Sequence, residues 1–271
     1  MIRRFAPALL LALALSPLAR AQEAKEAGPL APLVKVGEQL DKGFSAFLAG
    51  KEVKEAFAPW KPGKRAVEET RAQLAEAGVK RIVPAGFELE LVFLKEGKPL
   101  YYLRTFVSTL DGKPAFLAIG GRKLEDGKLY VKAQPLAAFK GAAEPFALAA
   151  KALEAALLSG DASKLPVADA EALSKRLALS ERDRRGVTKE TARARENLGR
   201  LPGEVKALGH DELQVRVDDQ TSFVYGEGEG EPLGMLRSGF ELVEGELVFS
   251  PGRFRPAQKP RPEAKTGEAP R

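Results

Sequence analysis

Two stretches of the chain carry apolar residues at the three- and four-residue steps of an amphipathic helix. Glycine often follows the last helical turn, and these stretches end at Gly50 and Gly160. The apolar positions are Leu33, Val36, Leu40, Phe44, Phe47 and Leu48 in the first stretch and Phe146, Ala149, Ala150, Leu153 and Leu157 in the second. Further helices are predicted at residues 65–77 and 169–179, and the polar stretch 181–200 is predicted to be one more.

Strands are predicted after each group of helices, because the apolar period there falls to about two. Residues 87–93 and 213–217 carry this alternation. Asp-Gly and Glu-Gly pairs favour the tight turns of hairpins. Such pairs stand at Glu96-Gly97, Asp111-Gly112, Asp126-Gly127 and Glu244-Gly245. Residues 124–129 and 242–247 match most closely, which indicates an internal duplication.

The order of helices first and antiparallel strands afterwards predicts an α+β fold of two similar modules, each with leading helices packed on a curved antiparallel sheet. The modules span residues 33–135 and 144–254. Residues 155–161 (AALLSGD) and 245–249 (GELVF) are similar to the end of the first helix and to the final strand of the nuclear-transport-factor-two-like, or cystatin-like, cone fold. This resemblance implies a cone that holds a small ligand, a catalytic Asp/His pair or neither, so it leaves the function open.

The first 21 residues have the pattern of a secretory signal peptide. Two arginines precede the apolar run 5–15, and Ala19 and Ala21 supply the small side chains that a signal peptidase requires. A membrane span needs about 20 apolar residues, and this run is about half as long. We therefore expect cleavage after Ala21, no stable insertion in a membrane, and a periplasmic or secreted protein.

The excess of positive over negative charge is concentrated near the two ends of the chain. The 271 residues contain 43 Lys+Arg and 37 Asp+Glu, a formal net charge of +6. Three arginines lie in residues 1–21, and residues 253–271 hold six basic and two acidic side chains. A nucleic-acid partner requires basic charge clustered on a folded face, so none is expected. Residues 22–32 are predicted to be a linker, and the Pro-rich residues 255–271 a disordered basic tail.

The composition excludes several kinds of chemistry. The chain has no cysteine and one histidine, which rules out disulfides, thiolate nucleophiles, iron–sulfur clusters and His-rich metal sites. His210 is predicted to be an exposed turn residue, and the alternative is a general base oriented by Asp211 or Glu212. The acidic run 226–231 favours a flexible hairpin over a calcium loop. No catalytic residue, metal or cofactor is assigned.

The aromatic residues give the one indication of a binding site. We predict that Phe93, Tyr102 and Phe106 line a cone pocket for a small apolar molecule. The sequence therefore favours an exported, non-enzymatic protein that binds a partner or a small apolar ligand in the cell envelope or outside the cell. The alternatives are a cone-fold isomerase or hydrolase that uses His210 or a buried carboxylate, and a structural component of the envelope.

Export yields the first testable prediction. When the whole chain is expressed in a bacterial host, intact-mass analysis of the exported form is expected to show a protein that begins at Gln22. The variant Ala21→Glu should keep its leader, because a charged side chain does not fit next to the cleaved bond. The control Ala24→Glu lies beyond the cleaved bond and should be processed normally. An exported form that still begins at Met1 would contradict this assignment.

Overall fold

The computed structural model describes residues 28–63, 67–125, 131–160, 165–228 and 230–257. The predicted signal peptide, most of the predicted linker and nearly all of the predicted tail lie outside the described residues. The predicted hairpin at Asp126-Gly127 lies outside them as well.

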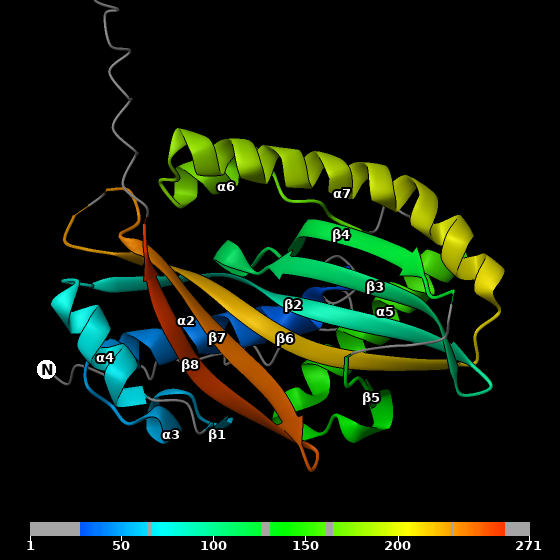
Figure 1. The fold of residues 1–271 in the computed structure, drawn as a ribbon, viewed down its shortest axis with the longest axis horizontal. Helices are drawn as coiled ribbons and strands as arrows, with labels where there is room; N and C mark the ends of the chain where they lie inside the picture. Colours follow the sequence, from blue (N-terminus) through cyan, green and yellow to red (C-terminus); the bar gives the residue numbers. More distant parts are fainter. Residues whose placement is uncertain (1–27, 64–66, 126–130, 161–164, 229, 258–271) are drawn as a thin grey trace, which may run out of the picture.

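Two three-stranded meanders join edge to edge into one sheet of eight strands (Figure 1). The strands are β1 (Lys61–Pro62), β2 (Arg81–Lys95), β3 (Lys98–Ser108), β4 (Ala115–Lys123), β5 (Gln134–Pro135), β6 (Glu212–Tyr225), β7 (Gly234–Val243) and β8 (Glu246–Pro256). Their order is β1-β8-β7-β6-β2-β3-β4, and β5 pairs with β6 outside this path. The predicted α+β class is confirmed, but the strands of both halves form one continuous sheet in place of a separate sheet in each module. The cause is the long antiparallel ladder between β2 and β6, the first strand of each meander.

The helices lie where the apolar periodicity places them. They are α2 (Val34–Leu48), α3 (Val53–Ala56), α4 (Val67–Glu76), α5 (Glu144–Ser159), α6 (Ala170–Arg176) and α7 (Glu181–Leu208), with short 3₁₀ helices η1 (Ala31–Leu33), η2 (Leu110–Gly112), η3 (Leu136–Ala138) and η4 (Gly141–Ala143). Helix α7 extends beyond the predicted end at residue 200, through Pro202. Its apolar stripe continues there, because Leu201 and Val205 are fully buried.

Helices of each half pack against the meander of the other half. Helix α4 lies on β8, where the Thr70 hydroxyl donates to the Gly252 carbonyl at 2.9 Å. Helix α7 runs along β4, where the Asn197 amide donates to the Ile119 carbonyl at 2.6 Å (Figure 1). The Tyr101 hydroxyl of β3 also donates to Glu204 of α7. One hydrophobic core therefore includes residues of both halves.

Two short parallel pairings also connect each half to the meander of the other half. Strand β1 pairs in parallel with β8, with Lys61 opposite Val248. Val167, which precedes α6, pairs in parallel with Phe116 of β4. A short strand between the helices was not evident from the sequence, and β1 is such a strand. Each pairing joins a segment from the helical part of one half to the last strand of the other.

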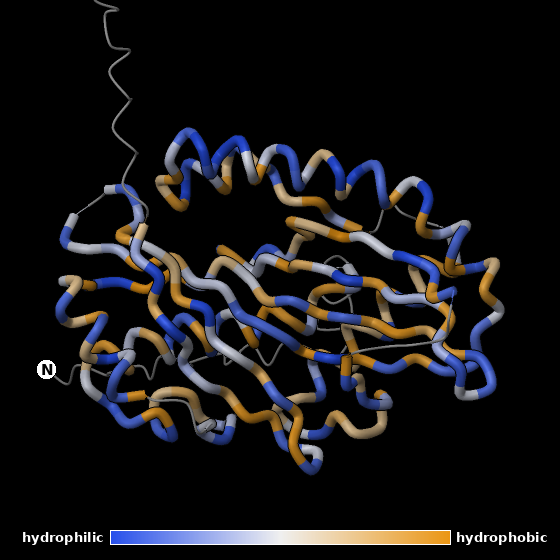
Figure 2. The backbone as a smooth tube through the Cα atoms, viewed as in Figure 1, coloured by the Kyte–Doolittle hydropathy of each residue, from blue (hydrophilic) through white to orange (hydrophobic). Residues whose placement is uncertain are grey.

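Hydrophobic and hydrophilic residues follow one another along the strands (Figure 2), and because successive strand side chains point to opposite faces, the two faces of the sheet differ in chemistry. On β2, Phe87 packs edge-on against Phe146 of α5, with ring centroids 5.5 Å apart, so this face meets the helices. Glu88 and Glu90 point to the opposite face, together with their cross-strand neighbours. We call this the polar face; it carries Glu88, Glu90, Tyr102, Arg104, Arg216 and Asp218.

A bulge in the β7–β8 ladder yields a prediction of stability. The register shifts between Arg237 and Gly239, and a Cβ atom on Gly252 would lie 1.0 Å from the Arg237 carbonyl oxygen. Gly252→Ala is therefore expected to lower the free energy of unfolding by about 2 kcal/mol or more. The control Gly199→Ala lies at an exposed position of α7 with nothing within 4 Å of the added carbon, and should raise the free energy of unfolding by about 0.5–1 kcal/mol. Urea unfolding measures both; a Gly252→Ala variant as stable as the parent would contradict the bulge.

Candidate functional site

The sheet divides between β6 and β7. Their ladder runs from Val224 opposite Gly234 to Asp219 opposite Gly239 and then stops. From there β6 stays paired with β2, and β7 stays paired with β8 as far as Val243. A register shift lies beside the division on each side, in the β2–β6 ladder and in the β7–β8 ladder. Bulges bend a strand and increase its twist, so the two shifts turn β6 and β7 apart.

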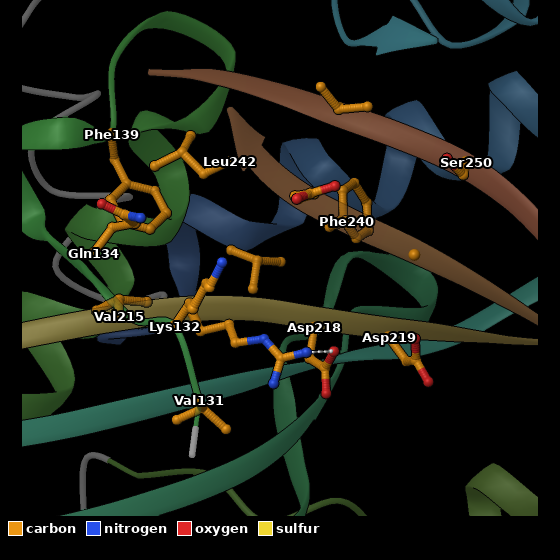
Figure 3. Close-up of a pocket in the computed structure, with 15 residues that line it drawn as sticks. Val131, Lys132, Gln134, Phe139, Val215, Asp218, Asp219, Phe240, Leu242 and Ser250 are labelled. Atoms are coloured by element: carbon orange, nitrogen blue, oxygen red, sulfur yellow. Dashed lines mark hydrogen bonds and ion pairs between the residues drawn. The ribbon is translucent and has the colours of Figure 1, made fainter. Parts of the chain in front are cut away.

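A pocket of about 400 Å³ occupies the space between the diverging strands (Figure 3). Its apolar wall is formed by Val215, Phe240 and Leu242. The segment around β5 closes one end of the pocket. Gln134 of β5 pairs with Val215 of β6, and Phe139, which follows β5, lines the pocket. The pocket therefore lies in the second meander and is built from segments far apart in the sequence.

Charged side chains of both signs line the same pocket. Arg216 donates to Asp218 at 2.6 Å and to Glu90 at 3.0 Å, so its guanidinium is held in place. Lys132 and Glu241 are exposed, and within the described residues neither has an ion pair. The lining thus offers a free cation and a free carboxylate beside a fixed guanidinium.

A carboxylate cluster adjoins the pocket through Asp218. Oxygens of Glu88, Glu90 and Asp218 lie within 4.8 Å of one another. Glu88 and Glu90 are 6 % and 4 % exposed, and buried carboxylates require partners. Arg104 donates two hydrogen bonds to the Glu88 carboxylate, from Nε to Oε1 and from Nη2 to Oε2, the second at 2.6 Å. The three carboxylates have the spacing of a cation site, but two arginines already compensate two of their charges.

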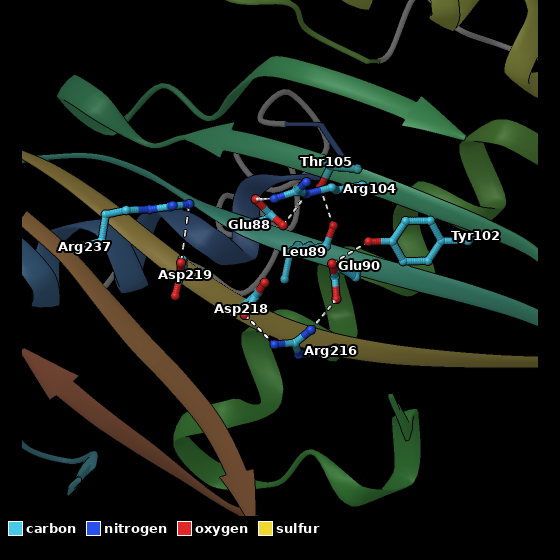
Figure 4. A network of polar contacts seen from close by, with 10 residues as sticks. All are labelled: Glu88, Leu89, Glu90, Tyr102, Arg104, Thr105, Arg216, Asp218, Asp219 and Arg237. Atoms are coloured by element: carbon cyan, nitrogen blue, oxygen red, sulfur yellow. Dashed lines mark hydrogen bonds and ion pairs between the residues drawn. The ribbon is translucent and has the colours of Figure 1, made fainter. Parts of the chain in front are cut away.

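Hydrogen bonds complete the network on the polar face (Figure 4). The Tyr102 hydroxyl donates to Glu90, and burial together with this carboxylate raises the pKa of Tyr102, so the hydroxyl stays protonated. Burial also raises the pKa of Asp218, although Arg216 opposes this, and the negative charge of Glu90 adds to the rise. The surroundings of Asp218 therefore raise its affinity for a proton above that of an ordinary aspartate.

The predicted ligand-binding residues are not brought together. Phe93 is fully buried on the helical face, where it contacts Tyr101. Tyr102 and Phe106 lie on the polar face, because Tyr101 stands opposite Phe93 in the ladder and the next side chain points the other way. None of the three lines the pocket between β6 and β7.

The prediction that His210 is exposed was wrong. Its side chain is 5 % exposed, and Nε2 lies 2.6 Å from a carboxylate oxygen of Glu154 on α5. Its ring packs edge-on against Phe93, with centroids 4.8 Å apart. Asp211, which the alternative paired with His210, instead accepts the Glu96 amide at 3.0 Å. The partner of His210 comes from a distant helix, which no local pattern could indicate.

No family model matches the chain, and no curated protein or solved structure does so either. The resemblance to the cone fold and the expected export stay predictions. Within the described ranges, no helix is long and apolar enough to cross a bilayer, in agreement with the expectation of no stable membrane insertion.

The opposite pKa shifts of two carboxyls yield a prediction of pH dependence. A raised pKa means that Asp218 contributes stability at low pH, which is lost as the pH rises through its folded-state value. Removing the group in Asp218→Asn should therefore make the variant more stable relative to the parent as the pH rises from 3 toward 7.

Glu204 provides the matched control. Burial alone would raise its pKa, but hydrogen bonds from Tyr101 and Arg200 outweigh burial and lower the value. Glu204→Gln should thus lose stability relative to the parent over the same rise in pH. Urea unfolding at several pH values measures both differences; slopes of the same sign would contradict the assigned environments.

Proposed function

We propose that the protein is exported and binds a small amphipathic molecule in the pocket between β6 and β7. The observation that carries the proposal is the pocket itself, about 400 Å³ in volume, with an apolar wall and charged residues at its rim. This volume lies within the range of about 300–1,000 Å³ that is typical of ligand sites, and the lining is more polar than that of most such sites. The exported location rests on the signal-peptide pattern of the first 21 residues.

The lining changes the kind of ligand expected from the sequence. Phe240 and Leu242 favour a ligand with an apolar part, in agreement with the apolar ligand expected from the sequence. Lys132 and Glu241 favour a polar or charged part, because charged groups at the rim gain from a partner of opposite sign. An amphipathic molecule satisfies both, so we replace the apolar ligand with an amphipathic one.

We also propose that the two halves are duplicates. Each half contains, in this order, a helix, a short segment in parallel pairing, further helical residues and a three-stranded meander; the first half has α3 in addition before its short segment, and the second has two helices, α6 and α7, after it. In both halves the short segment pairs with the last strand of the opposite half, and a common origin accounts for this shared arrangement. The halves differ at the pocket: the β2–β3 ladder continues to Lys95 opposite Lys98, whereas the β6–β7 ladder stops at Asp219. The gap between neighbouring strands of a meander therefore opens only in the second half, although Val131, Lys132 and Gln134 of the first half help to line it.

The single tryptophan offers a test of the pocket. Trp60 packs edge-on against Phe240 of the pocket wall, with ring centroids 5.2 Å apart. The dyes 8-anilinonaphthalene-1-sulfonate and N-phenyl-1-naphthylamine accept energy from tryptophan. We expect at least one dye to bind saturably with one site per chain, to quench Trp60 emission by energy transfer, and to raise the melting temperature by mass action.

A pocket-filling variant makes this test specific. Glu241→Phe places a large ring in the pocket mouth and should weaken dye binding about tenfold or more, whereas Lys98→Phe adds the same ring to an exposed position on β3 that does not line the pocket. Equal binding by the two variants, or no saturable binding of either dye to the parent chain, would overturn the proposed function.

A further inference from the structure

The pocket is bounded by strand edges that have no partner strand. From Phe240 to Val243, β7 pairs with β8 on one side, and no described strand faces it on the other. On β6, the residues from Arg216 to Asp218 also lack a partner on the side of the pocket. In a strand that is paired on one side, alternate N–H and C=O groups point to the free side. The two walls of the pocket therefore present unused backbone donors and acceptors.

The chain itself already adds a segment to one of these edges. Strand β5 pairs antiparallel with β6, with Gln134 opposite Val215 and Pro135 opposite Gln214. The pairing ends there, because Ala133 bonds back to the Val131 carbonyl at 3.2 Å and the chain turns away. This edge of β6 thus accepts an extended backbone, and the space beyond β5 is the pocket.

We propose that the ligand of this pocket is a short extended peptide, which adds as a strand between β6 and β7. This rests on the proposed function, of which it names the ligand class. The free edge of β7 has four residues, Phe240 to Val243, or about 13 Å of strand. A tetrapeptide therefore matches its length. Backbone pairing supplies affinity in such complexes, and pockets for alternate side chains supply specificity.

The lining also assigns the side chains of the peptide. Along β7, Phe240 and Leu242 point toward the helical face, and Glu241 points toward the polar face between them. Alternate side chains of an added strand would face the same two environments. Asp218 is paired with Arg216 and Asp219 with Arg237, whereas Glu241 has no ion pair among the described residues, so a basic residue of the peptide fits beside Glu241. The peptide is one in which apolar and basic residues alternate.

The test compares blocked tetrapeptides with purified protein. The probe is acetyl-Val-Lys-Val-Lys-amide, and its controls are the acetyl-Val-Glu-Val-Glu-amide and a form of the probe that is N-methylated at alternate amides. We expect the probe to bind saturably, to displace the bound dye and to raise the melting temperature. N-methylation should weaken binding about tenfold or more, because it removes backbone donors that strand addition requires.

A charge reversal tests the assigned side chains. Glu241→Arg should weaken binding of the lysine peptide about tenfold and strengthen binding of the glutamate peptide. The control Glu231→Arg makes the same change outside the pocket and should alter the binding of neither peptide. Equal binding of the N-methylated and unmethylated probes would overturn strand addition. If a dye occupies the pocket and no peptide does, the peptide proposal fails and the proposed function stands. If neither binds, both fail.

Discussion

The antiparallel ladder between β2 and β6 is the interaction on which the rest of the structure depends. It joins the two meanders into one sheet and lies at its centre. It also fixes where the helices go: once the meanders share a sheet, the last strand of each lies at an outer edge, within reach of the helices of the other half. Helix α4 on β8 and helix α7 on β4 follow from this arrangement. The network on the polar face does too, because Glu90 and Arg216 meet only across this ladder.

The buried charges on β2 specify the register of this ladder more than they stabilise it. Two carboxylates that are almost fully buried cost several kcal/mol each in lost hydration, and paired arginines recover this only in good geometry. The structure supplies that geometry: Arg104 holds Glu88 through two donors, and Arg216 bridges Glu90 to Asp218. A slip of β2 by one residue would turn both glutamates into the helical core and leave the arginines unpaired. The network therefore strongly penalises a slip by one residue.

The sequence predicts local features well and long-range ones poorly. The periods of 3.6 and 2 locate the helices and the strands, because each depends on residues a few positions apart. They carry no information on which strand pairs with which, so the joined sheet was not foreseen. His210 illustrates the same limit: its burial depends on Glu154 and Phe93, which approach it only in the fold. The site was missed for this reason, although the alternation of Arg216 and Asp218 on one strand face was a usable signal.

The pocket exists because a ladder that could have continued does not. In the first half, β2 and β3 stay paired to their turn, with a register shift between Phe93 and Leu94. In the second half, β6 and β7 part at Asp219, which leaves several backbone donors and acceptors without strand partners. Unpaired edges are a liability, since they invite pairing with other chains. Here β5 occupies the edge of β6 next to the unpaired residues, so a long strand of another chain cannot extend along that edge. A short segment can, and the same closure that protects the edge from aggregation limits what it accepts.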